Sequence, residues 1–370
     1  MANKRVELNE GARVEQQLNA LAREPFTAVA LARNRALVTG MFRQIAEFFG
    51  VRKLFGGRLR VLHEAIVTHS LRARHAGITK LTSRALVTGV FNQFALVRID
   101  GVEHEATIAG RLRHARPIVG DDVEVRTLPD GSVRIEAIGE RRGTLLRGGF
   151  RGREQLVAVN VDLLVIVASA ANPPLRSGLI DRYLVAAWRG GIQAALALTK
   201  LDLPHDESEV AQVRATLTSL GHAIVEVNPK SGAGVDAVRA LIGEQTAVLS
   251  GHSGVGKTTL SNRITQRDDA VGEINEVIGR GRQTTTLARH LPLTGGGALI
   301  DTAGIRSFGI AGVSVEQLQD AFPELVIARP DCEYLDCLHE QNEDGCAAPA
   351  HATPARLASY RKMLEELREL

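Results

Sequence analysis

One eight-residue segment constrains the fold of this 370-residue chain more than any other. Gly251–Thr258 matches the pattern G-x-x-x-x-G-K-[ST], which forms a phosphate-binding loop when a strand precedes it and a helix follows. Residues 246–249 are apolar and typical of such a strand, and residues 259–264 can form the helix. In this setting the glycines and the helix N-terminus bring backbone N–H groups to phosphate oxygens, and Lys257 reaches the terminal phosphates.

Alternating strand and helix patterns surround this loop and predict a doubly wound α/β sheet. Ligands bind such sheets at the carboxyl ends of the strands. Helical patterns cover residues 179–189 and 207–220. The apolar runs that predict buried parallel strands are 163–167, 194–198, 224–227, 246–249 and 298–300.

Two more segments suit a triphosphate site. Asp301 ends an apolar strand, where its carboxylate can hold Mg²⁺ together with the Thr258 hydroxyl, and Gly304 follows where it can contact a γ-phosphate. Residues 279–286 are polar and rich in threonine. This stretch can close over the phosphates as a switch, with one of its threonines completing the Mg²⁺ shell.

The ends of two earlier strands suit a guanine base. A carboxylate at Asp202 can accept hydrogen bonds from the N1–H and N2–H₂ groups of guanine, which adenine does not offer. Taken alone, the segment Thr199–Asp202 fits a surface Lys–Asp pair equally well. Residues 228–232 supply a second candidate loop at the next strand end. The base-contacting segments precede the phosphate-contacting ones, so the sequence predicts a circularly permuted GTPase.

The candidate nucleotide-contacting residues come from all of these segments. They are Thr199, Lys200, Asp202, Asn228, Lys230, Gly251, His252, Ser253, Gly254, Val255, Gly256, Lys257, Thr258, Thr259 and Gly304.

All three cysteines lie within fifteen residues, which excludes a disulfide scaffold. Cys332, Cys337, His339 and Cys346 form a Cys₃His set, the ligand combination of a closed structural zinc site. Independent buried thiols are the alternative. Residues 354–370 predict an amphipathic helix that covers the zinc module or the core rather than a membrane.

Residues 84–140 contain short β patterns separated by turn residues. The length of this segment is that of a small OB-type barrel. No aromatic residue occurs between 95 and 149, which disfavours base stacking. A barrel that binds nucleic acid would then contact phosphates through arginines, and a purely structural barrel is the alternative. The candidate arginines are Arg111, Arg113, Arg116, Arg141, Arg142 and Arg147.

Charge is unevenly distributed. Residues 1–84 carry a net charge of +9, whereas residues 154–370 carry −8. A basic end suggests a polyanionic partner, and a solvated basic face is the alternative.

Helical patterns occur at 8–24 and 41–55. The sequence of residues 35–44 recurs at residues 84–93 with eight matches in ten positions. The first copy is interpreted either as a partial duplication of the next domain's first strand or as part of an extension.

The combination of these motifs resembles the ribosome small-subunit-dependent GTPases (RsgA, also called YjeQ). The resemblance covers about residues 84–350 and includes the following segments: Asn160–Asp162, Ile180–Leu184, Gly251–Thr258, Asp301–Phe308, Phe322–Glu324 and the Cys332 cluster. It implies a cytoplasmic protein that binds the small (30S) subunit and its rRNA late in maturation. It also implies GTP hydrolysis to GDP that is faster on the subunit.

The sequence departs from the family pattern at four places. Thr199 replaces the Asn of Asn-Lys-x-Asp, Asn228-Pro229-Lys230 replaces Ser-Ala-Lys, Gln283 replaces a His, and Ala303 replaces a Pro. Ile305 occupies the position where Ras-like enzymes place a water-orienting Gln. We therefore expect slow intrinsic hydrolysis, with catalytic roles for Lys257, Thr285 and Gln283.

The expected architecture is multidomain α/β. It comprises a basic extension (1–83), an OB-type barrel (84–150), a permuted P-loop GTPase domain (151–318) and a zinc-binding helical module (319–370). We expect a cytoplasmic monomer with one Zn²⁺, with Mg²⁺ and GTP or GDP, with no membrane contact, and with rRNA contacts through the barrel, basic end and zinc module. The alternatives are a permuted GTPase acting on another ribosomal particle and an RNA-binding scaffold with degenerate hydrolysis.

Overall fold

The computed structural model describes residues 82–112, 114–148, 154–266, 288–301, 310, 312–341 and 343–369. All of them belong to one compact unit that begins at Leu81. The predictions for residues 1–81, including two helices and the first copy of the repeat, lie outside the described residues. None of the helices in the described part of the chain combines the length and apolar character needed to span a bilayer.

The first five strands close into a barrel. β1 pairs with β2 on one side and with β4 on the other, and the remaining order is β2-β3-β5-β4 with β3 and β5 parallel. Small and β-branched residues such as Val87, Val97 and Ile135 fill its interior. This topology confirms the predicted OB-type barrel, and its first strand contains most of the second repeat copy. The strands are β1 (Thr82–Val90), β2 (Phe94–Ile99), β3 (Val102–Ile108), β4 (Asp122–Thr127) and β5 (Val133–Ile138).

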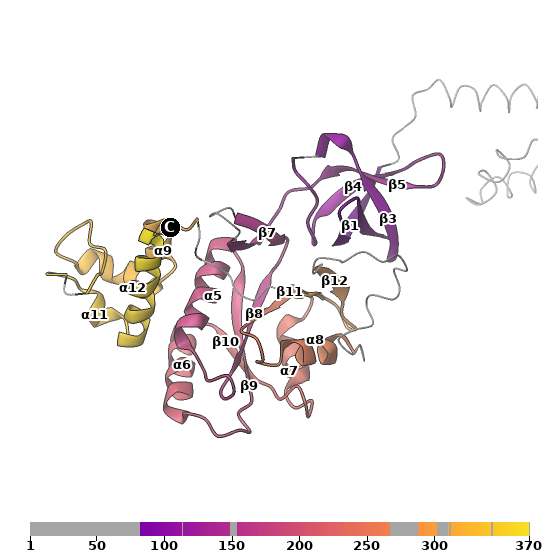
Figure 1. The fold of residues 1–370 in the computed structure, drawn as a ribbon. Helices are drawn as coiled ribbons and strands as arrows, with labels where there is room; N and C mark the ends of the chain where they lie inside the picture. The colour runs from indigo at the N-terminus through magenta and orange to yellow at the C-terminus, as the bar shows by residue number, and fades with distance from the viewer. Residues whose placement is uncertain are drawn as a thin grey trace, which may run out of the picture. The chain divides into compact units, whose positions relative to one another are not determined.

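Six neighbouring strands of one continuous eleven-stranded sheet form the core of the α/β domain (Figure 1). Their order is β10-β9-β8-β11-β13-β12, parallel except for β12, which also pairs with β1 of the barrel. Sequence reasoning found the five parallel strands but missed antiparallel β12. The strands are β8 (Leu163–Ser169), β9 (Gln193–Thr199), β10 (Ala223–Glu226), β11 (Thr246–Ser250), β12 (Arg289–Pro292) and β13 (Ala298–Asp301).

Helices cover both faces of this sheet. Along β8, Leu164 and Ile166 pack toward α5 and α6, whereas Val165 and Val167 pack toward α7 and α8. Because side chains alternate along a strand, a continuous apolar run serves both faces. The doubly wound prediction is confirmed. The helices are α5 (Ser177–Gly190), α6 (Glu207–Ser219), α7 (Val235–Ile242) and α8 (Lys257–Thr265).

A two-stranded hairpin, not predicted from sequence, lies between barrel and core in the chain: β6 (Leu145–Gly148) and β7 (Glu154–Ala158). The barrel contacts the core through both backbone and side chains. β1 pairs with β12, and Arg289 of β12 forms an ion pair with Glu103 of β3 at 3.2 Å. The Asn160 amide accepts from the Arg142 N–H at 2.8 Å and donates to the Gly120 carbonyl at 2.7 Å. A Cβ atom at Gly120 would lie 2.1 Å from the Val159 carbonyl oxygen, and one at Gly143 would lie 1.8 Å from that of Val161.

The C-terminal helices enclose a third core. Tyr360, Met363 and Leu364 are buried there with Phe322, and Val185 of α5 joins the cluster. The last helix covers this module, as its amphipathic pattern predicted. The helices are α9 (Val315–Asp320), α10 (Pro323–Ala328), α11 (Ala348–His351) and α12 (Pro354–Glu369).

A buried ionic cluster joins this module to α5. Arg356 of α12, 4% exposed, donates to Asp181 of α5 at 2.6 Å and to Glu324 of α10 at 2.7 Å. Its guanidinium also lies 4.2 Å from the Phe322 ring centre. The segments 180–184 and 322–324 therefore contribute a contact between helices, a nonlocal role that their sequences alone do not reveal.

Candidate functional site

The phosphate loop leaves β11 and enters α8, as predicted. A Cβ atom at Gly251 would lie 2.1 Å from the Val167 carbonyl oxygen, so the loop requires glycine where it crosses the end of β8. Gly256 has a φ of 102° and precedes α8 without a side-chain cap. The first N–H groups of α8 have no partner within the helix, the usual arrangement of an anion-binding N-terminus.

Lys257 lies at the start of α8, half-buried. Its ammonium donates to the His252 carbonyl at 2.6 Å, inside the loop. Burial lowers the pKa of this lysine below its usual range. An anion bound in the loop would stabilise the charged form, because an opposite charge offsets the cost of desolvation.

The first predicted base-contacting segment lies against the phosphate loop. The Thr199 side chain is fully buried, with its hydroxyl 2.8 Å from the Val255 carbonyl and 3.2 Å from that of Ala168. Lys200 extends along the loop and donates to the Gly254 carbonyl at 2.8 Å. The threonine that departs from the family pattern thus contacts the phosphate loop directly.

Lys200 also donates to the carbonyl of Asn172 in the loop between β8 and α5. Sequence reasoning missed this loop because its contribution is a backbone oxygen, which no side-chain pattern signals. Asp202 is exposed two residues beyond Lys200.

The second predicted base-contacting segment approaches the loop from its other side. Asn228 accepts from the N–H groups of Lys230 at 3.1 Å and Ser231 at 3.2 Å, which fixes a tight turn. A Cβ atom at Gly256 would lie 3.6 Å from Cγ of Pro229. The structure therefore brings residues 199–200, 228–230 and 251–257 together.

The remaining candidates divide into two groups. Asp301 ends β13, which pairs in parallel with β11, and Thr258 and Thr259 are exposed in the first turn of α8. Gln283, Thr285 and Gly304 lie outside the described residues.

Four of the six candidate phosphate-contacting arginines, Arg111, Arg116, Arg141 and Arg147, have partners within the protein, and Arg113 lies outside the described residues. Arg141 forms an ion pair with buried Asp121 at 2.8 Å, and Arg111 forms one with buried Glu136 at 3.0 Å. Hydrogen bonds to the Asp121 carboxylate hold the pKa of Arg141 above its usual value. Arg116 bonds the Asn92 carbonyl at 2.5 Å, and Arg147 bonds Gln155 at 2.6 Å.

An aromatic pair lies just before the interval 95–149, which contains no aromatic residue. Phe91 and Phe94 stack at the turn between β1 and β2, with ring centres 4.4 Å apart and planes inclined by 13°. Both are half-buried. This turn precedes residue 95 and so lies outside the interval without aromatic residues.

Comparison with known proteins identifies the family. A family model described as RsgA GTPase matches residues 138–311. The small ribosomal subunit biogenesis GTPase RsgA of Pseudomonas aeruginosa (strain LESB58) is 39% identical over 261 residues, 68% of this chain and 76% of that relative. This chain belongs to the RsgA GTPase family. An RsgA of Chlorobaculum parvum is 34% identical over 267 residues, 68% of this chain and 85% of that relative.

Solved structures agree with the RsgA assignment. YjeQ from Thermotoga maritima matches with a TM-score of 0.60 and 26% identity, over 78% of this chain and all of that one. YloQ, described as a circularly permuted GTPase, matches with a TM-score of 0.60 over 78% of this chain and 96% of that one. At 22% identity the second match shows the fold alone. The chain is a GTP hydrolase with the permuted fold expected from its motif order.

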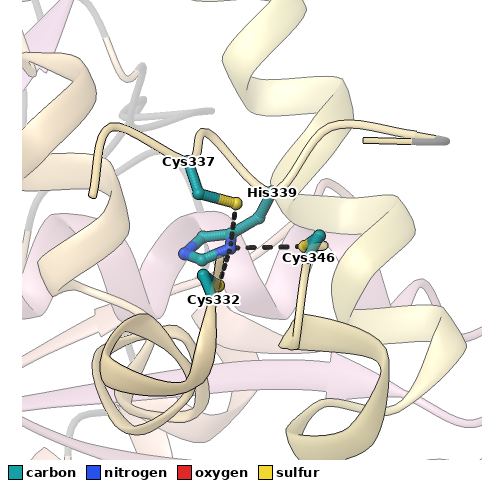
Figure 2. A group of neighbouring side chains, drawn as sticks. All are labelled: Cys332, Cys337, His339 and Cys346. Carbon is teal, nitrogen blue, oxygen red and sulfur yellow. Dashed lines mark hydrogen bonds between the residues drawn. The ribbon is translucent and has the colours of Figure 1, made fainter. Parts of the chain in front are cut away.

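The chain also carries a candidate metal centre. Figure 2 shows the sulfur atoms of Cys332, Cys337 and Cys346 surrounding Nδ1 of His339, at 3.7, 3.4 and 3.5 Å. All four candidate ligand atoms lie within 4.8 Å of one another. Tetrahedral zinc with Zn–S of about 2.3 Å and Zn–N of about 2.0–2.1 Å requires S···N separations of about 3.6 Å. The four residues therefore fit a metal ion of this size.

Neighbouring groups hold the ligands in place. Gln319 donates to the Cys337 carbonyl at 2.9 Å, Tyr360 donates to the Leu338 carbonyl at 2.8 Å, and Arg361 donates to that of His339 at 3.0 Å. Burial raises the pKa of the Cys337 thiol, and the two neighbouring cysteines raise it further. Thiolates at this site therefore need a cation to stabilise them.

Thr199 provides a test of the contact with the phosphate loop. Thr199→Val should cost about 1–2 kcal/mol of stability, because it leaves buried carbonyl oxygens without a donor. Nucleotide affinity should fall about five- to tenfold as the loop loosens. Thermal unfolding and nucleotide titration measure both effects. Thr199→Ser keeps the hydroxyl and should behave like wild type; equal losses in the two variants would contradict the role of the hydroxyl.

Proposed function

We propose that this protein assists late maturation of the small ribosomal subunit by binding its rRNA and hydrolysing GTP to GDP and phosphate. Relatives at 34–39% identity are named small ribosomal subunit biogenesis GTPases. The observation that carries the nucleotide assignment is the 2.8 Å bond from Lys200 to the Gly254 carbonyl. It joins the candidate base-contacting and phosphate-contacting segments in one place.

In the proposed site, the Asp202 carboxylate accepts two hydrogen bonds from guanine, while Lys200 and Thr199 hold the base-contacting segment against the phosphate loop. Asn228 and Lys230 complete the base-binding side. Backbone N–H groups of residues 251–259 bind the phosphates, Lys257 neutralises the β and γ phosphates, and Gly304 contacts the γ-phosphate.

Mg²⁺ would be held by oxygen ligands, the type that this ion prefers. Thr258 and Asp301 suit it, because β11 and β13 are parallel neighbours whose carboxyl ends share an edge. The ion supplies positive charge that stabilises the transferring phosphoryl group. We assign completion of its ligand shell to Thr285 and orientation of the attacking water to Gln283.

Slow intrinsic hydrolysis is part of the proposal. Ile305 has no hydrogen-bonding group where Ras-like enzymes carry a water-orienting Gln. A partner that completes this arrangement would then control the rate. We assign one Zn²⁺ to the Cys₃His site, where four protein ligands leave no open position for chemistry. A monomeric state and a cytoplasmic location also belong to the proposal.

Single-turnover GTP hydrolysis, measured with and without purified small subunits, tests the proposal. The free protein should hydrolyse GTP well below ~1 s⁻¹, at the slow end of enzyme rates, and small subunits should accelerate it at least tenfold. Acceleration by large subunits alone would favour action on another particle. Failure to hydrolyse GTP in either case would favour an RNA-binding scaffold.

Lys257→Ala tests the phosphate-loop assignment. It should weaken GTP binding by about 30- to 150-fold, because hydrogen bonds to charged groups contribute about 2–3 kcal/mol. Equilibrium titration with a fluorescent GTP analogue measures the change, and metal content should stay at the wild-type value. Unaltered GTP affinity would reject the assignment.

A further inference from the structure

The zinc module exposes large apolar side chains at one place in the chain. Leu335 is 98% exposed and Tyr334 is 52% exposed, in the loop between two candidate zinc ligands. Val326 and Ile327, on the helix just before that loop, are 43% and 62% exposed. Only three other large apolar residues are exposed in the rest of the described chain. Concentrated exposure of this kind marks interaction sites.

The loop is held in a fixed conformation. Cys332 and Cys337 at its two ends belong to the Cys₃His cluster. The Cys337 N–H donates to the Tyr334 carbonyl at 3.3 Å, and the Glu333 N–H donates to the Gly345 carbonyl at 2.9 Å. Tyr334 and Leu335 are therefore presented on a braced turn, which lowers the entropy lost when a partner covers them.

The same loop region is acidic. Residues 329–346 contain six Asp or Glu and a single Lys or Arg, Arg329, which pairs with Asp320 at 2.9 Å. Glu333, Asp336 and Asp344 are exposed, and within the described residues they form no ion pair. Phosphate groups of RNA would meet like charge here, whereas a basic protein surface would meet opposite charge.

We propose that this surface docks on a basic, partly apolar surface of a protein, with Leu335 and Tyr334 as its central anchors. The inference rests on the proposed function, since the small subunit carries the partner. We call the surface, made of Val326, Ile327, Glu333–Asp336 and Asp344, the zinc-loop face. The rRNA contact expected for the zinc module is the competing prediction, and the experiments below decide between the two. Exposed aromatic and large aliphatic anchors within a charged rim are typical of protein–protein interfaces.

Site-specific photocross-linking distinguishes protein from RNA. Full-length protein carrying p-benzoylphenylalanine in place of Leu335 is bound to purified small subunits with a non-hydrolysable GTP analogue and irradiated. We expect adducts to one or a few basic ribosomal proteins, identified by mass spectrometry. The same substitution at Val102, 59% exposed on β3 of the barrel, is the matched control and should not give those adducts.

The outcomes separate the inference from the proposed function. If the unsubstituted protein fails to co-sediment with small subunits, the proposed function fails and the inference falls with it. If it co-sediments but position 335 cross-links only to rRNA, or to nothing, the inference alone is overturned.

Two substitutions give an independent measurement. Leu335→Ser, at an almost fully exposed position that should not affect folding, should weaken subunit binding about 30-fold, the usual effect of truncating an interface anchor. Metal content and subunit-free GTP hydrolysis should stay unchanged. Asp336→Lys should also weaken binding at low salt. Tighter binding of Asp336→Lys would indicate an RNA partner and overturn the inference.

Discussion

Replacement of Cys337 by serine should remove the bound metal and unfold the C-terminal module, while the GTPase domain stays folded. A serine hydroxyl does not supply the thiolate that zinc requires, and structural zinc binding contributes about 10–16 kcal/mol to the folding of small modules. The third core packs against Leu338 and Cys346, so it depends on the conformation of the ligand loop. Metal content by mass spectrometry should fall from about one ion per chain to near zero. In limited proteolysis, the first cuts should occur within the C-terminal module, residues 319–370.

Leu335→Ser is the matched control for this experiment, because it introduces the same residue into the same loop without touching a ligand. It should keep the metal and the protease resistance of wild type. A Cys337→Ser protein that retains one tightly bound ion would show that the cluster is not a Cys₃His site.

Arg356→Met should destabilise the protein by about 3–5 kcal/mol, the usual cost of removing one partner from a buried ion pair. The substitution keeps the aliphatic bulk but leaves Asp181 and Glu324 without their cation. Burial already raises the pKa of Asp181, and loss of the guanidinium would raise it further. The deficit should therefore shrink at acid pH, where the carboxyl becomes neutral. Urea denaturation at two pH values measures both effects.

Arg214→Met is the control, because Arg214 forms an exposed pair with Glu226 on the surface of the domain that contains Asp181. It should leave the denaturation midpoint almost unchanged at both pH values, since exposed ion pairs contribute little. Similar losses in the two variants would mean that burial of Arg356 adds nothing to its effect.

Local patterns predicted the parts of the fold that depend on neighbouring residues. The spacing of Gly251, Gly256 and Lys257 fixes a loop between a strand and a helix, and the structure has that arrangement. The apolar runs of the parallel strands are also local signals, because both faces of such strands are covered. β12 was missed because its sequence, Arg289–Pro292, has no apolar run and its pairing with β1 of the barrel is a nonlocal contact.

Nonlocal contacts explain what the sequence did not reveal. The hydroxyl of Thr199 contacts the phosphate loop 56 residues away, and Arg356 bonds Asp181 across 175 residues. The same limitation applies to the barrel arginines, whose internal acceptors, such as Asp121 for Arg141, become visible only when the strands close. A residue's type indicates what it can bind, whereas its partner depends on the whole topology.

The two glycines at the junction of barrel and core have a practical consequence. At Gly120 and Gly143 even a methyl group would overlap a carbonyl oxygen of the following segment. At these two points the main chains of barrel and core meet directly, and the fit there depends on the absence of a side chain. A chimaera that joins another barrel to this core would need glycine at both positions, however well the rest of its surface were chosen.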